Sequence, residues 1–223
     1  MTKTTCQWTT DAAAALLVVA PTIAALAGPA RAARLPLAEF TALAKRCAPQ
    51  AAPSTMAAIA RVESGFDPLT IHDNTSGASA APATAAEAIA IATSLLAAGH
   101  SLDLGIMQIN SANLSPLGLT VSAAFDACRS ITASEAILAG DYTGGTTHEA
   151  RQAALRIAIS KYNTGSPTAG FTNGYVAKVE AATHAPAVAV SSPPAAPASP
   201  GWDVYAQSSG AQFVFGQGEQ HAR

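Results

Sequence analysis

The 223-residue sequence is short of charge, aromatic residues and cysteine. Only 12% of its residues are Asp, Glu, Lys or Arg, 5% are aromatic, and three are cysteines. Its net charge is -2 and it contains no basic run, which argues against a nucleic-acid binder held by phosphate contacts. Beyond the N-terminus no run of about 18 or more apolar residues occurs, which argues against an internal membrane span. Alanine makes up about a quarter of the chain, so much of its apolar content is helix-forming rather than bulky.

The N-terminus has the pattern of an export signal. An apolar run over residues 12–27 leads to Ala30-Arg31-Ala32, which fits an A-x-A cleavage site. We therefore predict a signal peptide over residues 1–32, the alternative being an N-terminal anchor helix. Cleavage after Ala32 would remove Cys6 and leave Cys47 and Cys128. In an exported chain these two are candidates for a disulfide, and the alternative is a pair of buried free thiols.

Residues 33–183 have a helical pattern and form the main predicted domain. Hardly any alternating strand pattern occurs, so the fold class is mainly α, with a possible small β-hairpin within residues 67–82. Candidate helix starts follow from capping residues. They are Leu35-Pro36 for a first helix closed by Pro49, Ser54 for a second, Thr84 with Glu87 for one ending near Gly99, Thr132 with Glu135, and Thr146 with Glu149.

The composition changes at His184. Residues 184–200 consist mainly of Ala, Pro, Ser and Val, which is typical of an extended linker. After it come Trp202, Tyr205 and Phe213, too few aromatic residues to form a core of their own. Residues 184–223 are predicted to be a tail that either docks on a partner, for example by adding a strand to an exposed edge, or stays unstructured.

Glu63 is the candidate general acid. In the helix expected after Ser54, Met56, Ile59, Ala60 and Glu63 fall at i, i+3, i+4 and i+7, so the glutamate continues an apolar stripe. It also lies at the C-terminal end of that helix, where the dipole disfavours a negative charge. Burial and dipole both raise a carboxyl pKa towards the range that acid catalysis needs at neutral pH. The alternative is a glutamate that bends out to water.

Two further segments carry polar groups among apolar ones. Gln108 and Asn110 are interleaved with bulky apolar residues, so their amides either line a cleft and bind sugar hydroxyl or acetamido groups, or belong to a buried turn. Tyr162 and Asn163 stand at the end of another helix, before Gly165. A phenol there can hold a carboxylate in place, or it can be an ordinary core tyrosine with its hydroxyl at the rim.

Taken together, these segments resemble the soluble lytic transglycosylase family. The order is Glu63-Ser64, then Gly105-Ile106-Met107-Gln108-Ile109-Asn110, then Tyr162-Asn163. Further segments are similar to the VirB1-type branch, which is associated with type IV secretion and conjugation machines. They are Cys47-Ala48-Pro49, Ser101-Leu102-Asp103-Leu104-Gly105, Ala124-Phe125-Asp126-Ala127-Cys128, Tyr162-Asn163-Thr164-Gly165 and the segment 170–176. The resemblance covers about residues 35–180 and does not reach the tail.

The resemblance implies that residues 33–183 are a catalytic domain with a lysozyme-like helical fold and a glycan cleft, and that peptidoglycan is the substrate. The predicted signal peptide implies a periplasmic location. Glu63 would protonate the glycosidic oxygen between N-acetylmuramic acid and N-acetylglucosamine and then act as base on the sugar's C6 hydroxyl, closing a 1,6-anhydro ring. Ser64, Gln108 and Asn110 would position substrate or bridge the cleft. Tyr162 would orient Glu63 and Asn163 would support that corner, while Asp103 is interpreted as structural.

Other chemistries have little support in the sequence. The five histidines are scattered and no C-x-x-C pair occurs, so no metal site and no cofactor is expected. Two alternatives remain. One is a hydrolytic muramidase of similar fold, in which water replaces the C6 hydroxyl. The other is a non-catalytic assembly factor that binds glycan and recruits type IV secretion components through its tail.

Overall fold

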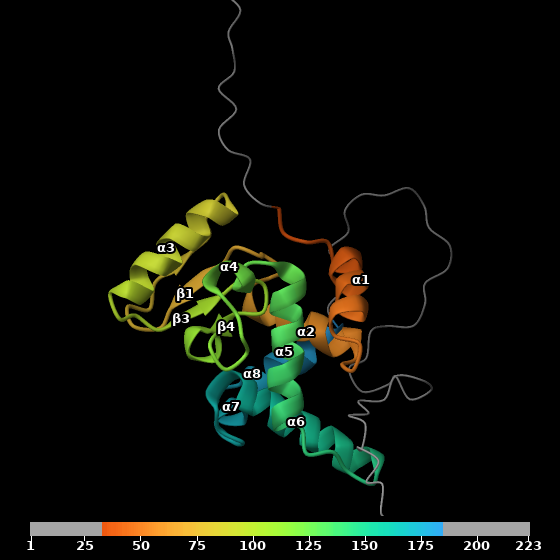
Figure 1. Ribbon diagram of the computed structural model, residues 1–223. Coiled ribbons are helices and arrows are strands. Elements are labelled where there is room, and N and C mark those ends of the chain that lie inside the picture. The colour runs from red at the N-terminus through yellow and green to blue at the C-terminus, as the bar shows by residue number, and fades with distance from the viewer. Residues whose placement is uncertain (1–32, 185–223) are drawn as a thin grey trace, which may run out of the picture.

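A computed structural model describes residues 33–184, and it confirms the mainly α fold class (Figure 1). The predicted signal peptide and nearly all of the predicted tail lie outside the described residues. The helices are α1 (Leu37–Cys47), α2 (Pro53–Glu63), α3 (Ala85–Ala97), α4 (Val121–Ala124), α5 (Ala127–Asp141), α6 (His148–Thr164), α7 (Ala169–Thr172) and α8 (Tyr175–His184). The strands are β1 (Ile71–Asp73), β2 (Ser79–Ala80), β3 (Leu102–Leu104) and β4 (Ile109–Asn110), and the 3-10 helix η1 (Ser111–Asn113) follows β4.

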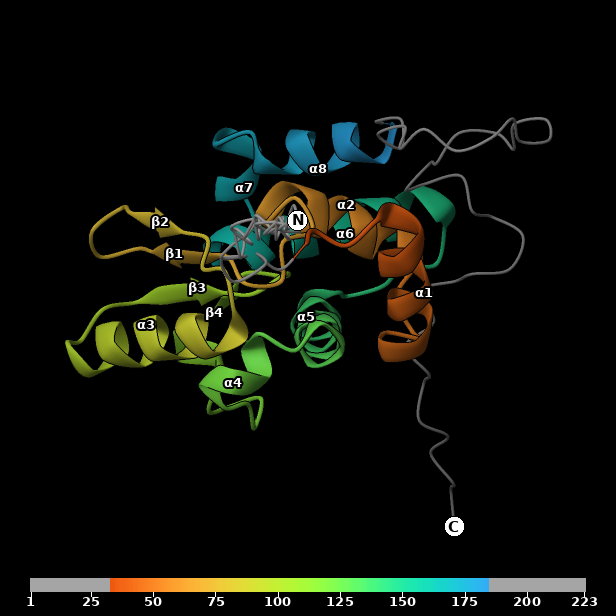
Figure 2. The ribbon, with the colours of Figure 1, turned by 90° about the horizontal axis from the view of Figure 1, so that it is seen from above.

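The four strands form one antiparallel sheet in the order β2-β1-β3-β4. The hairpin expected within residues 67–82 is present as β1 and β2, whereas β3 and β4 were not expected from the sequence. Figure 2 shows the sheet, α3 and α4 on one side of α5, with α1 on the other.

The helix that carries Glu63 is held in the core. α2 packs against α8 and α1. Met56, Ile59 and Ala60 are fully buried on the stripe that the sequence indicated. Their burial fixes the direction in which the last residue of α2 points. Within residues 33–184 no helix is long and apolar enough to span a bilayer.

Some helix starts differ from those expected. The Thr84 hydroxyl accepts from Glu87 N, as predicted. Ser54 lies inside α2, which begins at Pro53, because proline fits the first helical position, where no backbone donor is needed. Thr132 lies in the middle of α5, whose N-cap is Asp126, and Thr147 rather than Thr146 caps α6.

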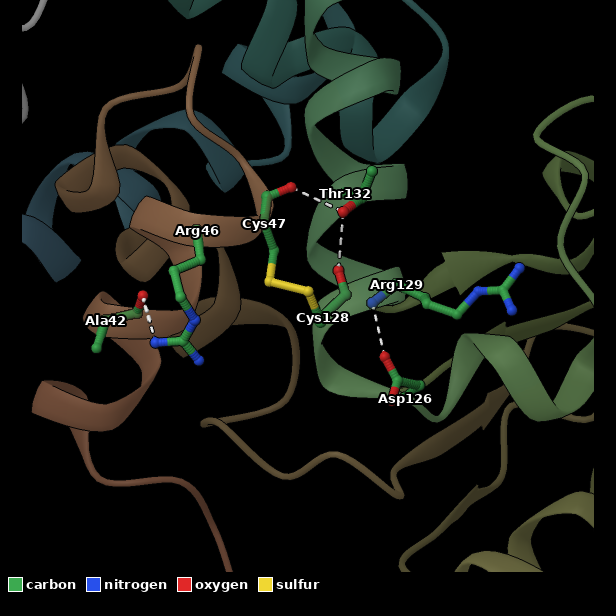
Figure 3. Close-up of a disulfide and its surroundings, with 7 residues drawn as sticks. All are labelled: Ala42, Arg46, Cys47, Asp126, Cys128, Arg129 and Thr132. Atoms are coloured by element: carbon green, nitrogen blue, oxygen red, sulfur yellow. Dashed lines mark hydrogen bonds between the residues drawn. A yellow bond between two sulfur atoms is a disulfide. The ribbon is translucent and has the colours of Figure 1, made fainter.

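Thr132 and Glu135 instead connect α5 to the segment after α1. The Thr132 hydroxyl donates to Cys47 O at 2.7 Å, and the Glu135 carboxylate accepts from Gln50 N and Ala51 N at 2.7 and 2.9 Å. In the same place Cys47 and Cys128 form a disulfide, which confirms that prediction (Figure 3). One covalent bond and three hydrogen bonds thus join α1 and the segment that follows it to α5.

Candidate active site

Glu63 is the last residue of α2 and lines a cleft of about 410 Å³. The cleft runs between the sheet and its loops on one side and α5 and α6 on the other. It brings together five of the six site residues expected from the sequence, Ser64 being the exception. The lining residues are Glu63, Asn74, Asp103, Gln108, Ile109, Asn110, Asn113, Ile137, Asp141, Lys161, Tyr162, Asn163, Thr164 and Gly165.

Burial raises the pKa of the Glu63 carboxyl from an ordinary 4.5 to about 7. A hydrogen bond donated by the Tyr175 hydroxyl to Glu63 Oε1 opposes this shift, because it stabilises the charged form. The negative charge of Asp103, across the cleft, adds to the rise. The result is a carboxylic acid that is close to half protonated at neutral pH.

Tyr175 is the site residue that the sequence reasoning missed. It is buried at the start of α8, and its backbone N–H donates to Asn173 Oδ1 at 2.9 Å. Burial and the neighbouring Glu63 charge raise the pKa of its phenol, so the hydroxyl stays a donor. The segment 170–176 contains Tyr175, but nothing in its spacing relates this residue to a helix that ends 112 positions earlier.

Tyr162 lines the cleft, as expected. The resemblance implied that it would orient Glu63, but its hydroxyl bonds to a different residue. Its hydroxyl donates to Met107 O at 2.7 Å, so it holds the turn between β3 and β4 against α6. Burial, followed by the charge of Glu63, raises the pKa of Tyr162. The orienting contact to the glutamate comes from Tyr175 instead, because α8 packs directly on α2.

The turn between β3 and β4 has a fixed backbone. Gly105 has φ 75°, and a Cβ there would lie 2.0 Å from Ala124 O, so the position requires glycine. Gln108 also has a positive φ of 48°, which is uncommon for a residue with a side chain. Its Nε2 donates to Thr70 O and Gly105 O at 3.0 and 2.8 Å. Both amide hydrogens are therefore used, which leaves Oε1 as an acceptor for a ligand in the cleft.

Ser64 and Asn110 make contacts within the protein. Ser64 is buried, and its hydroxyl donates to Ile106 O at 2.7 Å, so it joins the end of α2 to the β3–β4 turn. Asn110 Nδ2 donates to Asp103 Oδ1 at 2.7 Å, and its Oδ1 accepts from Ala112 N at 3.0 Å. Asn110 therefore fixes Asp103, although it also lines the cleft.

Asn163 is exposed at the end of α6. Its Oδ1 accepts from Asn173 Nδ2 at 3.0 Å. Because Asn173 also caps the start of α8, this bond connects the cleft rim to the helix that carries Tyr175. That Asn163 supports this corner of the site during the reaction stays a prediction.

The cleft contains one carboxyl group that is suited to proton transfer at neutral pH. This group is Glu63, whose pKa is near neutrality. Asp103 is a further carboxylate in the same cleft. No group of three or more His, Cys, Asp or Glu side chains that could hold a metal comes together within residues 33–184. The remaining polar groups of the cleft are mainly amides and hydroxyls, which are suited to neutral sugars.

Comparisons with known proteins identify the family to which this chain belongs. A family model described as "Transglycosylase SLT domain" matches residues 40–184.

"Protein virB1" of Agrobacterium fabrum is 52% identical over 151 residues, which cover 68% of this chain and 62% of that protein. "Protein virB1" of Rhizobium radiobacter is 49% identical over 173 residues, 75% of this chain and 72% of that protein. "Type IV secretion system protein virB1" of Brucella suis biovar 1 is 41% identical over 149 residues, covering 64% of this chain and 63% of that protein. The match thus spans less than two thirds of the Agrobacterium fabrum and Brucella relatives. No solved structure matches the chain.

Proposed function

Since this chain belongs to the transglycosylase SLT domain family and is a homologue of VirB1, we propose that it is a peptidoglycan lytic transglycosylase. The substrate would be the β-1,4 bond between N-acetylmuramic acid and N-acetylglucosamine. The observation that carries the proposal is Glu63, whose carboxyl lies in the cleft with its pKa raised to about 7. A group with that pKa can give and take a proton within one reaction at neutral pH.

Glu63 performs both proton transfers in this proposal. In the first step its protonated carboxyl donates to the glycosidic oxygen, so the bond to C1 of the muramic acid breaks and the N-acetylglucosamine portion leaves as an alcohol. In the second step the resulting carboxylate takes the proton of the C6 hydroxyl, whose oxygen forms a bond to C1. The product carries a 1,6-anhydro ring, and Glu63 is protonated again.

The neighbouring residues support this cycle. The Tyr175 hydroxyl orients Glu63 Oε1 and stabilises the carboxylate that forms after the first transfer. The negative charge of Asp103 adds to the effect of burial, and both favour the protonated form of Glu63 from which the cycle starts. The acetamido group of the substrate would assist at C1, so no enzyme nucleophile is required, in contrast to glycosidases that use two carboxylates.

Gln108, Tyr162 and Asn163 would position the glycan. Both amide hydrogens of Gln108 are bound by backbone carbonyls, so it is the acceptor Oε1 that would receive a hydrogen bond from the glycan. Tyr162 holds the β3–β4 turn, and with it Gln108, at a fixed distance from α6. Ser64 does the same from α2, so its contribution is to bridge the walls of the cleft.

Mass spectrometry of digested cell wall tests the proposal. Wild-type protein should release muropeptides with 1,6-anhydro ends, and a folded Glu63→Gln variant should release them orders of magnitude more slowly. Reducing ends would instead support a hydrolytic muramidase. Full genetic complementation by Glu63→Gln, with no cleavage by the wild type, would support a glycan-binding assembly factor.

We also propose that this activity opens the wall for a type IV secretion or conjugation machine, as the name of the Brucella relatives suggests. Export to the periplasm through residues 1–32, and association with the machine through residues 184–223, belong to the same proposal. Removal of residues 184–223 should spare activity on purified peptidoglycan and weaken association with secretion components. Loss of activity on purified wall would assign the tail to the enzyme.

A further inference from the structure

An ion pair forms part of the cleft wall opposite the sheet. Lys161 Nζ lies 2.5 Å from Asp141 Oδ1, and both residues line the cleft that contains Glu63. Asp141 is the last residue of α5, and Lys161 directly precedes Tyr162 on α6. The Lys161 side chain is 33% exposed and the Asp141 side chain 24% exposed, so both are partly buried in the wall of the cleft.

Binding of an uncharged sugar does not require a lysine and an aspartate in the cleft wall. The glycan presents hydroxyl and acetamido groups, for which the amides and phenol of the cleft are adequate partners. The charged groups of peptidoglycan are on the stem peptides that extend from muramic acid, and their carboxylates are negative. Among the lining residues in the described part of the chain, Lys161 alone is a cation.

We propose that Lys161 binds a carboxylate of the stem peptide and makes the enzyme favour peptide-bearing glycan over bare glycan. This inference rests on the proposed function. It assigns Lys161 a role in choosing the substrate, separate from the proton transfers of Glu63. It also predicts that the wall of the cleft formed by α5 and α6 faces the peptide-bearing side of the muramic acid.

The geometry suits this role. An ammonium group has three donors, and Asp141 accepts one of them, so the others remain for a ligand. Asp141 also holds Nζ in the cleft, which reduces the rotamer freedom that Lys161 loses on binding. A charge-assisted hydrogen bond from this position should favour the peptide-bearing substrate by about tenfold in kcat/KM.

The test compares two substrates made from one preparation of glycan strands. One keeps its stem peptides, and the other has been stripped of them with an amidase. The lactyl carboxylates that the amidase exposes are then converted to methylamides, so that the bare glycan carries no charge. For the full-length wild-type chain we expect a kcat/KM about ten times higher on the peptide-bearing strands, decreasing with added salt. Lys161→Met should bring this ratio close to one, whereas Lys161→Arg should keep most of it.

Two further variants separate substrate choice from stability. Asp141→Asn breaks the ion pair but keeps the ammonium, so it should preserve the preference. Lys178→Met removes an exposed lysine of α8 that does not line the cleft, and it should leave the ratio unchanged. If Lys161→Met does not fold, Lys161→Gln replaces it as the neutral variant.

Each outcome has one meaning. Equal rates of the wild type on both substrates would overturn the inference and leave the proposed function intact. If Lys161→Met and Asp141→Asn lowered both rates by the same factor, the pair would be structural, which also overturns it. Absence of cleavage of either substrate by the wild type would refute the proposed function itself.

Discussion

Replacing Glu63 with Gln should abolish activity and at the same time stabilise the protein at high pH. The side chain keeps its size but carries no proton to transfer and no charge to bury. In the wild type the folded-state pKa of Glu63 is about 7, compared with an ordinary 4.5. Folding therefore favours the protonated form of Glu63. The stabilisation of the folded state that results is fully present below pH 4.5 and is lost as the pH rises through 7.

The magnitude follows from the pKa difference. Above pH 7 the wild type buries a charge at a cost of roughly 3 kcal/mol relative to the neutral carboxyl, which the Gln variant avoids. The pKa of about 7 already includes the hydrogen bond from Tyr175 to the carboxylate, so no separate correction is needed for it. We therefore expect Glu63→Gln to be about 3 kcal/mol more stable at pH 8, and equally stable at pH 4.

Urea unfolding followed by circular dichroism at both pH values measures this difference. For a domain of about 150 residues it corresponds to a rise of about 6–12 °C in Tm at pH 8. Glu39→Gln, on the exposed surface of α1, controls for the loss of one negative charge. Equal stability of Glu63→Gln and wild type at pH 8 would refute the burial of this carboxyl. Near-wild-type cleavage would refute its role as acid, since acid–base catalysis contributes about 10²–10⁴-fold.

Two further predictions concern the contacts around the site and the disulfide. Tyr175→Phe removes the hydrogen bond that lowers the pKa of Glu63, so the alkaline limb of the pH–rate profile, near pH 7 in the wild type, should move to higher pH while the rate falls about tenfold. Tyr162→Phe, which loses a bond to Met107 O instead, should leave the limb in place, and an unmoved limb in Tyr175→Phe would contradict the assignment. Replacing Cys47 and Cys128 together by Ser should lower the free energy of unfolding by about 4 kcal/mol, because the bridge closes a long loop. Chemical denaturation with and without reductant checks this, and an unchanged midpoint in the wild type on reduction would contradict it.

Sequence patterns within one helix predicted those features of the site and fold that depend on neighbouring residues. The apolar stripe of Met56, Ile59 and Ala60 places Glu63 correctly, because helical periodicity relates neighbouring turns of one helix. The cap at Thr84 was also correct, since a cap depends on residues three apart.

Contacts between distant segments were not predictable in this way. β3 and β4 contain three and two residues and exist through pairing with β1 and with each other, which no short pattern reveals. Tyr175 reaches Glu63 only because α8 packs on α2. Thr132 and Glu135 resembled a capping box, yet both serve the chain 85 positions earlier. A capping pattern has the same composition whether its partner is local or remote.

The Cys47–Cys128 bridge also decides what a protease can remove. The covalent ring closed by the bridge contains all of α2, the sheet and α3, and hence Glu63 and Gln108. A cut at an exposed point of that ring, such as the turn after β1, leaves two fragments that are still joined through sulfur. The fragment that carries Tyr162 and Tyr175 therefore stays attached to the one that carries Glu63. In an oxidising compartment, nicked enzyme should keep both walls of its cleft together, and it should separate into pieces only after reduction and unfolding.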